Sequence, residues 1–409
     1  KFTISGTDWN AAVTLAGHGS GGNTEGVRLY DAVVYKGQVM AVVSAGDPEH
    51  DGGNEGGETE FHLVRTNDFS TVVLANNDIS NQSGTIATAI TRRSNEDDHL
   101  ARLLVFGNTL LIALWTGSNI VVFKSTNAHS ATEGSQASVT QVASINAATG
   151  KSGGEDYIRG FVVWRDPYTA GVPAGAILST EENIYLLDVA NNSYTELFPS
   201  GFLTGGPGDG RMTVGSNGNL YFTRGENIME ASVVGLGHVN IRNVGPSTRT
   251  NIPNTAQAVD ATFSGHGDGL VSSKQGVPTF LYGGSTDWLY VAYGGTTSGK
   301  KKSILAMDYN TKAWHSVYYD DGTTFNDDGD GRIWGMILSS EDDGVQRLHW
   351  WQEGGSRAPG SNSVHYYIEE PERPPRQRVE STDNGFKATG YIEFAEDDHG
   401  DPQISTAIL

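Results

Sequence analysis

Two stretches of this sequence repeat one pattern at an offset of 120 residues, and this repeat limits the possible folds more than any other feature. Asn183–Phe198 and Ser303–Asp321 each alternate apolar residues up to an Asp, pass through a small polar turn and resume on an aromatic residue. Each stretch therefore predicts a strand, a turn and a second strand. The matched pairs are Ile184 and Ile304, Leu187 and Met307, Asp188 and Asp308, Tyr194 and Trp314, and Leu197 and Val317.

A second marker extends the repeat along the chain. Asp209-Gly210-Arg211 before one apolar run returns as Asp330-Gly331-Arg332 before another, an offset of 121 residues. Six apolar runs in all follow polar, mostly acidic loops, with spacings that centre near half of this offset. The runs are Arg28-Leu29-Tyr30, Arg102-Leu103-Leu104, Arg159-Gly160-Phe161, Arg211-Met212, Leu270-Val271 and Arg332-Ile333-Trp334. The sequence thus predicts six similar units.

Short turns between β-branched or aromatic runs predict a hairpin in every unit. The expected turns are Lys36-Gly37, Gly107-Asn108, Thr180-Glu181-Glu182, Ser216-Asn217-Gly218, Gly283–Asp287 and Glu341–Gly344. Apolar residues at i, i+3, i+4 and i+7 are nearly absent, so we expect few helices.

Repeated units of this kind predict an all-β chain that folds as a β-propeller of six or seven four-stranded blades. A usual blade has about 40–50 residues, and we assign the excess here to long loops such as Asp47–Glu60 and Asn127–Gln136. A parallel β-helix is the alternative, although its coils would be much shorter than these units.

The chain ends are expected to differ from the blades. Residues 1–26 hold one strand-like piece, Phe2–Ser5, and a Gly-rich lead-in, whereas residues 27–370 hold the blades. Residues 371–409 begin as a Pro-rich linker and continue with two strand-like runs, Phe386–Phe394 and Ile404–Leu409. These runs either close the propeller together with Phe2–Ser5 or begin a further, truncated domain.

Composition excludes several classes of partner and site. The chain lacks Cys, which excludes disulfides and thiolate metal sites. Its formal charge of −21 would repel a phosphate backbone, so we expect no nucleic acid partner and no anionic membrane surface. The sequence contains no apolar run long enough for a membrane span.

The sharpest local motif is a candidate calcium loop at residues 326–331. Asn326, Asp328 and Asp330 supply oxygen ligands at positions 1, 3 and 5, and Gly331 occupies position 6. Position 12 is Ile337, where the full motif has a bidentate Glu. Two interpretations stay open: a partial calcium site that a distant carboxylate completes, or an acidic turn between blades. No cofactor other than calcium is expected.

Other polar clusters carry weaker signals. Asp47–Glu60 is dense in carboxylates but matches no ligand spacing, so it is interpreted as a solvated loop. Five arginines recur near the starts of the expected inner strands, where they either bind an anion or pair with the acid that precedes each of them. They are Arg28, Arg102, Arg159, Arg211 and Arg332. Nucleophile elbows, phosphate loops and catalytic triads are not found.

Tryptophans offer one route to a ligand. Indole rings stack on sugars, but large aromatic residues also fill the wedges between blades, and packing is the preferred interpretation here. The residues concerned are Trp288, Trp314, Trp334, Trp350 and Trp351.

The turn Met307–Val317 (MDYNTKAWHSV) resembles the blade hairpins of β-propeller domains in virion structural proteins of tailed phages, and Ala388–Phe394 is similar to a strand that commonly follows such a propeller. The resemblance implies a non-enzymatic tail, fibre or head-surface protein that acts through contacts with other structural proteins and forms a homo-oligomer. Its location would be the virion or the extracellular space. The alternative is a secreted carbohydrate-binding or carbohydrate-active propeller that recognises a surface glycan. A propeller hydrolase or oxidoreductase is a third hypothesis, for which the sequence names no residues.

Overall fold

A computed structural model of the chain describes its regular core. The described residues are 28–45, 60–67, 73–76, 100–116, 119–132, 135–147, 157–171, 173–180, 182–199, 210–224, 227–245, 277–294, 302–320, 333–340, 345–352, 364–369 and 371. Several regions discussed above lie outside this set, namely both chain ends, nearly all of Asp47–Glu60 and the candidate calcium loop at 326–331.

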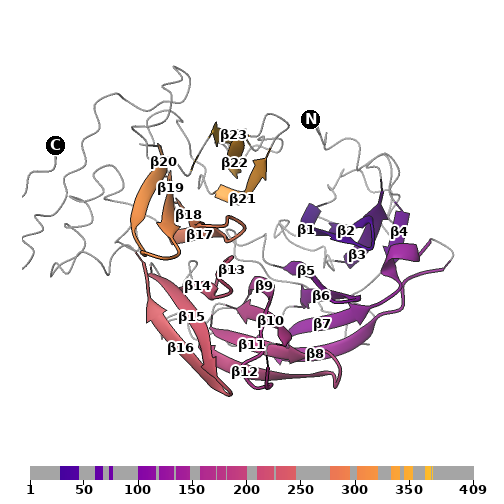
Figure 1. Cartoon of the computed structure of the whole chain (residues 1–409). Helices are drawn as coiled ribbons and strands as arrows, with labels where there is room; N and C mark the ends of the chain where they lie inside the picture. Colours follow the sequence, from indigo (N-terminus) through magenta and orange to yellow (C-terminus); the bar gives the residue numbers. More distant parts are fainter. Residues whose placement is uncertain are drawn as a thin grey trace, which may run out of the picture. The chain divides into compact units, whose positions relative to one another are not determined.

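The described residues form six antiparallel sheets, which we number in chain order (Figure 1). Sheet one holds β1 (Arg28–Tyr35), β2 (Gln38–Ala45), β3 (Glu60–Thr66) and β4 (Val73–Asn76). Sheet two holds β5 (Ala101–Phe106), β6 (Thr109–Trp115), β7 (Asn119–Ser125) and β8 (Thr140–Asn146). Sheet three holds β9 (Ile158–Arg165), β10 (Ala174–Thr180), β11 (Asn183–Asp188) and β12 (Ser193–Pro199).

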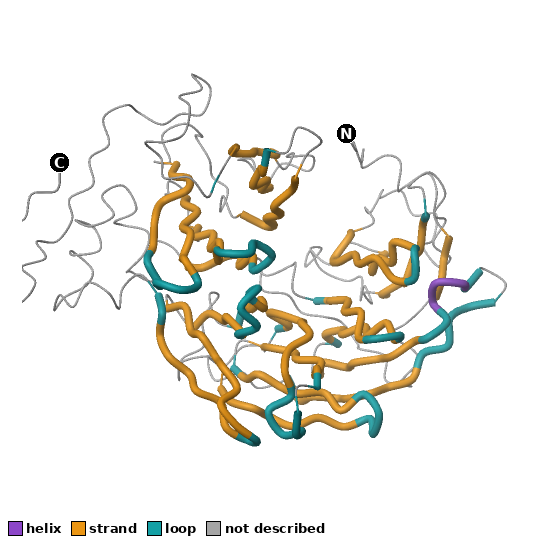
Figure 2. Tube along the Cα trace, viewed as in Figure 1, coloured by secondary structure: helices purple, strands orange, loops and turns teal. Residues whose placement is uncertain are grey.

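The second half of the chain continues the pattern. Sheet four holds β13 (Met212–Val214), β14 (Leu220–Arg224), β15 (Asn227–Gly235) and β16 (His238–Asn243). Sheet five holds β17 (Val277–Tyr282), β18 (Trp288–Gly294), β19 (Lys302–Asp308) and β20 (Trp314–Asp320). Sheet six holds β21 (Ile333–Ser340), β22 (Gln346–Gln352) and β23 (Val364–Glu369). Figure 2 shows one short helix among the described residues, η3 (Ala128–Ser130), in the loop expected at 127–136.

The chain divides into two compact units, and each is considered by itself. Unit 1 comprises Lys1–Val214, Gly218–Gly225 and Ala231–Ile241, and unit 2 comprises Gly215–Asn217, Glu226–Glu230 and Arg242–Leu409. In unit 1 the first strands of successive sheets lie next to one another, β1 beside β5, β5 beside β9 and β9 beside β13 (Figure 1). In unit 2, β17 lies beside β21. Antiparallel meanders that adjoin through their first strands are the blades of a β-propeller, so the predicted fold class is confirmed with six blades.

The repeat of 120 residues is confirmed at the level of single hydrogen bonds. Asp188 Oδ1 accepts the backbone N–H groups of Ala190 and Asn191 at 3.1 and 3.0 Å. Asp308 Oδ1 accepts those of Asn310 and Thr311 at 2.8 and 2.7 Å. These Asx turns stabilise the two hairpins in the same way. In both, the fourth residue after the Asp adopts a positive φ, 53° at Asn192 and 61° at Lys312.

A β-bulge also recurs at the repeat spacing. The register of β11 against β12 shifts between Ile184 and Tyr185, and that of β19 against β20 shifts between Ile304 and Leu305. Leu197 and Val317, matched by the sequence pattern, are therefore the extra residues of two equivalent bulges. Similar shifts occur in the first strand pair of sheets one, three, five and six.

The expected turns among the described residues lie between adjacent strands, and Glu341–Gly344 lies outside the described residues. Two expectations differ in position. Lys36-Gly37 and Gly107-Asn108 join the first two strands of their sheets, but Thr180–Glu182 joins the second and third strands of sheet three. The first described strand of sheet five begins at Val277, beyond the predicted run Leu270-Val271, which lies outside the described residues. The sequence does not predict this strand because of Pro278, since Pro lacks the N–H that most strand positions donate. Here it sits near the strand start and beside a bulge.

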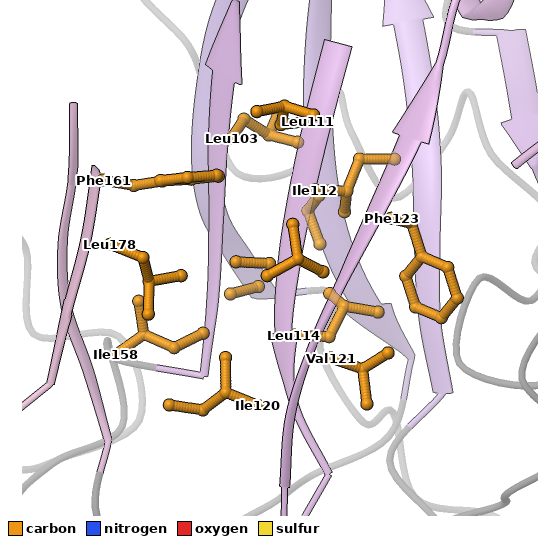
Figure 3. Close-up of a cluster of buried hydrophobic side chains, with 14 of the residues drawn as sticks. Leu103, Leu111, Ile112, Leu114, Ile120, Val121, Phe123, Ile158, Phe161 and Leu178 are labelled. Carbon is orange, nitrogen blue, oxygen red and sulfur yellow. The ribbon is translucent and has the colours of Figure 1, made fainter. Parts of the chain in front are cut away.

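Apolar side chains hold the sheets of unit 1 together. Figure 3 shows buried side chains of β5, β6, β7, β9 and β10 gathered in one cluster. Leu103, Ile112, Phe161, Ile158 and Leu178 all belong to it. Because strands alternate their faces, each sheet presents one such row to its neighbour. Burial of a side chain of this size contributes about 1.5–3 kcal/mol.

Unit 2 combines an apolar core with a buried ion pair. Tyr290, Ile304 and Val317 of sheet five pack in one cluster with Leu348 and Trp350 of sheet six. The ion pair is formed by Glu230 of β15, which is buried and accepts Lys312 Nζ on Oε1 at 2.6 Å and Arg242 Nε on Oε2 at 2.5 Å. The second copy of the repeated hairpin is thereby attached to residues of sheet four.

Candidate functional site

The candidate calcium loop is not among the described residues. Asn326, Asp328 and Asp330 all lie in the undescribed stretch 321–332, so calcium binding stays a prediction. Within the described part of the chain, no group of three or more His, Asp or Glu side chains is placed to hold a metal ion. Ile337, at position 12 of the motif, lies on β21 and is exposed.

The recurring arginines are described at three of their five positions. Arg102 Nη1 donates to the carbonyl oxygens of Ala101 and Tyr30 at 3.1 and 3.4 Å, which connects β5 to β1. Arg159 and Arg211 are buried at the starts of β9 and β13. The acids expected to pair with these arginines lie outside the described residues, so neither interpretation of the arginines is tested.

The carboxyl group of Asp31 connects the same two strands. It accepts the backbone N–H groups of Leu103 and Ala32 at 2.8 and 2.9 Å. Burial raises the pKa of Asp31 above its usual value, and the charge of Arg102 and these hydrogen bonds oppose the rise only in part. Because its oxygens bind neighbouring backbone, Asp31 fixes one blade against the next.

The Asp-Gly-Arg marker has a steric explanation in unit 1. Gly210 has a φ of +75°, and a Cβ atom on it would lie 1.8 Å from the carbonyl oxygen of Thr180. Only Gly can follow this path so close to another backbone. We therefore assign Gly210 to blade packing, whereas Asp209 and the second copy of the marker, Asp330-Gly331-Arg332, lie outside the described residues.

Most of the tryptophans pack as expected. Trp350 is buried, with its ring 4.7 Å from that of Tyr318. Trp288 lies against His315 with ring centroids 4.6 Å apart, and Trp314 Nε1 donates to the carbonyl oxygen of Val244 at 2.8 Å. The side chain of Trp334 is not described.

Trp351 is the exception, and it belongs to an exposed apolar surface on sheet six. Ile337, His349 and Tyr367 are paired across the three strands, and Trp351 pairs with Gly335 in the adjacent row. Trp351 is 40% exposed, Ile337 48% and Tyr367 52%. The rings of His349 and Tyr367 lie 5.8 Å apart. We call these four residues, Ile337, His349, Trp351 and Tyr367, the aromatic face.

The strand period explains why this surface forms. Side chains alternate between the two faces of a sheet, so Met336, Leu348 and Trp350 point into the core that sheet six shares with sheet five. Their neighbours in sequence must point the other way. Trp350-Trp351 gave only part of this signal, because the period puts the two rings on opposite faces, and in a strand such as β6 the residues of both faces are buried. The sequence predicted packing for both residues, and only Trp350 is buried.

Polar groups border the aromatic face. The next row along the strands pairs Ser339 with Arg347 and Arg347 with Glu369. Arg347 donates from Nε and Nη2 to Glu369 Oε1 at 3.1 and 2.9 Å. Ser339 Oγ and His349 Nε2 lie within hydrogen-bonding distance, at 2.8 Å. The surface thus combines exposed rings with hydrogen-bonding groups at one end.

Comparisons with known proteins concern the fold alone. No family model and no curated protein matches the chain. The periplasmic gluconolactonase of Pseudomonas aeruginosa is similar in structure, with 11% identity, a TM-score of 0.42 and coverage of 83% of this chain and 88% of that one. An α-L-arabinanase of Penicillium chrysogenum, complexed with arabinobiose, shows 14% identity, a TM-score of 0.42 and coverage of 83% and 93%.

A third structure, a puromycin-hydrolyzing peptidase of Mycobacterium tuberculosis, shows 12% identity and a TM-score of 0.34. The similarity covers 81% of this chain but only 44% of the length of that protein. The described part of the chain holds no helix with the length and apolar character that a membrane crossing requires. The resemblance to virion proteins, the assembly partners and the homo-oligomer stay predictions.

Proposed function

We propose that this protein binds carbohydrate on the aromatic face of sheet six. The single observation that carries the proposal is the group of rings on the side of the sheet opposite to its core, where Trp351 and Tyr367 are exposed and His349 lies partly buried beside Tyr367. Contiguous exposed apolar side chains with a polar rim mark interaction sites on soluble proteins. Flat aromatic rings suit the apolar faces of sugars, and the polar rim suits their hydroxyl groups.

The same surface favours binding over hydrolysis. A glycosidase generally needs two carboxyl groups on either side of the scissile bond. On the described part of this face Glu369 is the one carboxylate, since its row contains Ser339 and Arg347 and the adjacent rows contain the aromatic residues. The proposed role is therefore that of a binding propeller, acting outside the cell as the sequence led us to expect.

A glycan array probed with the purified chain and its variants tests this proposal. Trp351→Ala and Tyr367→Ala each remove one exposed ring, and we expect each to weaken binding of the positive glycans about tenfold or more, or about 1.4 kcal/mol. The matched control is Tyr168→Ala, because Tyr168 is a similarly exposed aromatic residue in unit 1. It should leave binding unchanged.

Two results would overturn the proposal. One is an array on which the parent chain binds no glycan. The other is glycan binding that survives both Trp351→Ala and Tyr367→Ala, which would place the site elsewhere. Thermal unfolding of each variant provides the check that a loss of binding is not a loss of fold, and replacement of exposed side chains should move the melting temperature little.

A further inference from the structure

The charges beside the aromatic face indicate which sugars it accepts. Glu369 follows Tyr367 by two residues on β23, so its side chain leaves the same face of the sheet one step further along. The Glu369 side chain is 51% exposed, whereas that of its partner Arg347 is 12% exposed. A glycan lying on the rings would therefore meet the carboxylate rather than the guanidinium.

The geometry of the ion pair leaves the carboxylate able to bind sugar hydroxyls. Nε and Nη2 of Arg347 donate to the same oxygen of Glu369, Oε1. An ionised carboxylate accepts hydrogen bonds on both oxygens and donates none. Oε2 can thus accept from a hydroxyl group, and hydrogen bonds to a charged acceptor are the stronger kind.

The same carboxylate disfavours an acidic sugar. A uronate, sialate or sulfate group placed beside Glu369 would bring two negative charges together, and the chain as a whole already carries a formal charge of −21. Arg347 offsets part of this repulsion, but its side chain is 12% exposed against 51% for Glu369, so an anion on the open surface would lie nearer to the carboxylate.

We infer that the aromatic face selects uncharged glycans and that Glu369 is the residue that excludes acidic ones. The inference rests on the proposed function, since it describes the specificity of the same surface. Glu369 has two parts in this selection: it accepts hydrogen bonds from hydroxyl groups of a neutral chain, and it repels a carboxylate or sulfate in the equivalent position.

A matched pair of probes tests the inference after the array. Oligomers of β-1,4-linked mannose and of β-1,4-linked mannuronate share one backbone and differ in charge. We expect array signals confined to neutral glycans, and calorimetric binding of the mannose oligomers at least about tenfold tighter than that of the mannuronate oligomers. Binding of the neutral probe should change less than about twofold between low and high salt, because no charge on the ligand is screened.

Glu369→Gln provides the decisive variant, because it keeps the shape of the side chain and removes the charge. We expect the preference for the neutral member of the pair to fall at least about fivefold, because the repulsion is lost while the Gln side chain can still accept a hydrogen bond from Arg347. Gln346→Glu is the control: it adds a negative charge on β22 without altering Glu369, and it should leave the preference in place.

The outcomes separate this inference from the proposed function. If the array shows acidic glycans bound as well as or better than neutral ones, and this binding requires Trp351, the inference is wrong and the proposed function stands. An unchanged preference in Glu369→Gln would likewise remove Glu369 as the discriminating residue. If no glycan binds the parent chain, both proposals fail.

Discussion

The hairpins β11–β12 and β19–β20 share one backbone but are attached to the protein by different chemistry. Both have the Asx turn, the positive φ and the bulge. In the first hairpin, Val189 accepts a hydrogen bond from Lys124 Nζ at 2.7 Å, and Tyr194 is exposed. In the second, the turn itself provides the cation, Lys312, which is buried against Glu230.

The difference shows which positions determine the fold of the hairpin and which determine its attachment. Asp188 and Asp308 bind their own turns and are identical in the two copies. Among the positions that differ are Asn192 against Lys312 and Tyr194 against Trp314. In the second copy Lys312 contacts Glu230 of sheet four, and Trp314 contacts Val244, which directly follows that sheet. Four predictions test this separation of roles.

The largest effect is expected for Glu230→Ala. Removing the carboxylate leaves the buried ammonium group of Lys312 without its charge partner, and loss of one member of a buried pair costs about 3–5 kcal/mol. The free energy of unfolding, measured with urea, should fall by this amount. Glu230→Ala combined with Lys312→Met should recover part of it, because a buried apolar pair avoids the unpaired charge. A loss below about 1 kcal/mol would show that the ion pair does not attach the hairpin.

Trp314 and Tyr194 occupy equivalent positions, and their replacement by Ala should have unequal effects. Trp314→Ala removes a half-buried ring and its hydrogen bond to Val244, and we expect a loss of about 2–4 kcal/mol. Tyr194→Ala removes an exposed ring that contacts Tyr185 edge to face, and we expect about 0.5–1 kcal/mol. If the two variants lost equal free energy of unfolding, the two hairpins would not differ in how they are attached to the protein.

The two turn aspartates should behave alike as pH changes. Hydrogen bonds from the Asn191 side chain and backbone lower the pKa of Asp188. Burial by itself would raise the pKa of Asp308, but the bonds from Thr311 and Asn310 outweigh it and lower the pKa. An Asp whose pKa is lowered on folding stabilises the protein at pH values above its pKa in the unfolded chain, about 3.8. This stabilisation is lost as the pH falls through the pKa of the folded protein.

Asp31 has the opposite sign and serves as the control for this pH experiment. Its pKa is raised on folding, so its contribution is fully present below the unfolded value and is lost as pH rises through the folded value. On going from neutral to acidic pH, the urea midpoint should fall less in Asp188→Asn and in Asp308→Asn than in the parent chain. In Asp31→Asn the urea midpoint should fall more on acidification than in the parent chain. If the dependence of the urea midpoint on pH changed in the same direction in all three variants, these roles of the three aspartates would be wrong.

The smallest effect is expected for Asn192→Gly. Asn and Gly both tolerate a positive φ, so the free energy of unfolding should change by no more than about 0.5 kcal/mol. Lys312→Gly relieves the same backbone conformation but removes the cation, and it should cost at least about 2 kcal/mol. If the two variants had similar unfolding curves, backbone conformation rather than the ion pair would control both turns.

Short-range patterns predicted the fold well because a blade hairpin is specified locally. Alternation, the Asp before the turn and the aromatic residue after it all lie within about sixteen residues of sequence. The contact of Glu230 with Lys312 spans 82 residues, and no local pattern specifies such a partner. The aromatic face was missed for a related reason. The strand period places Trp350 and Trp351 on opposite faces, but only the arrangement of the sheets shows which face is covered.

The equivalent bulges at Leu197 and Val317 also affect how this chain can change over generations. A strand whose pairing slips by one residue turns every side chain beyond the slip to the opposite face. Deletion of either bulge residue would therefore invert the remainder of β12 or β20 and expose a buried ring such as Phe198. We expect these two hairpins to diverge by substitution while their lengths stay constant, so insertions and deletions should accumulate in the connections between blades.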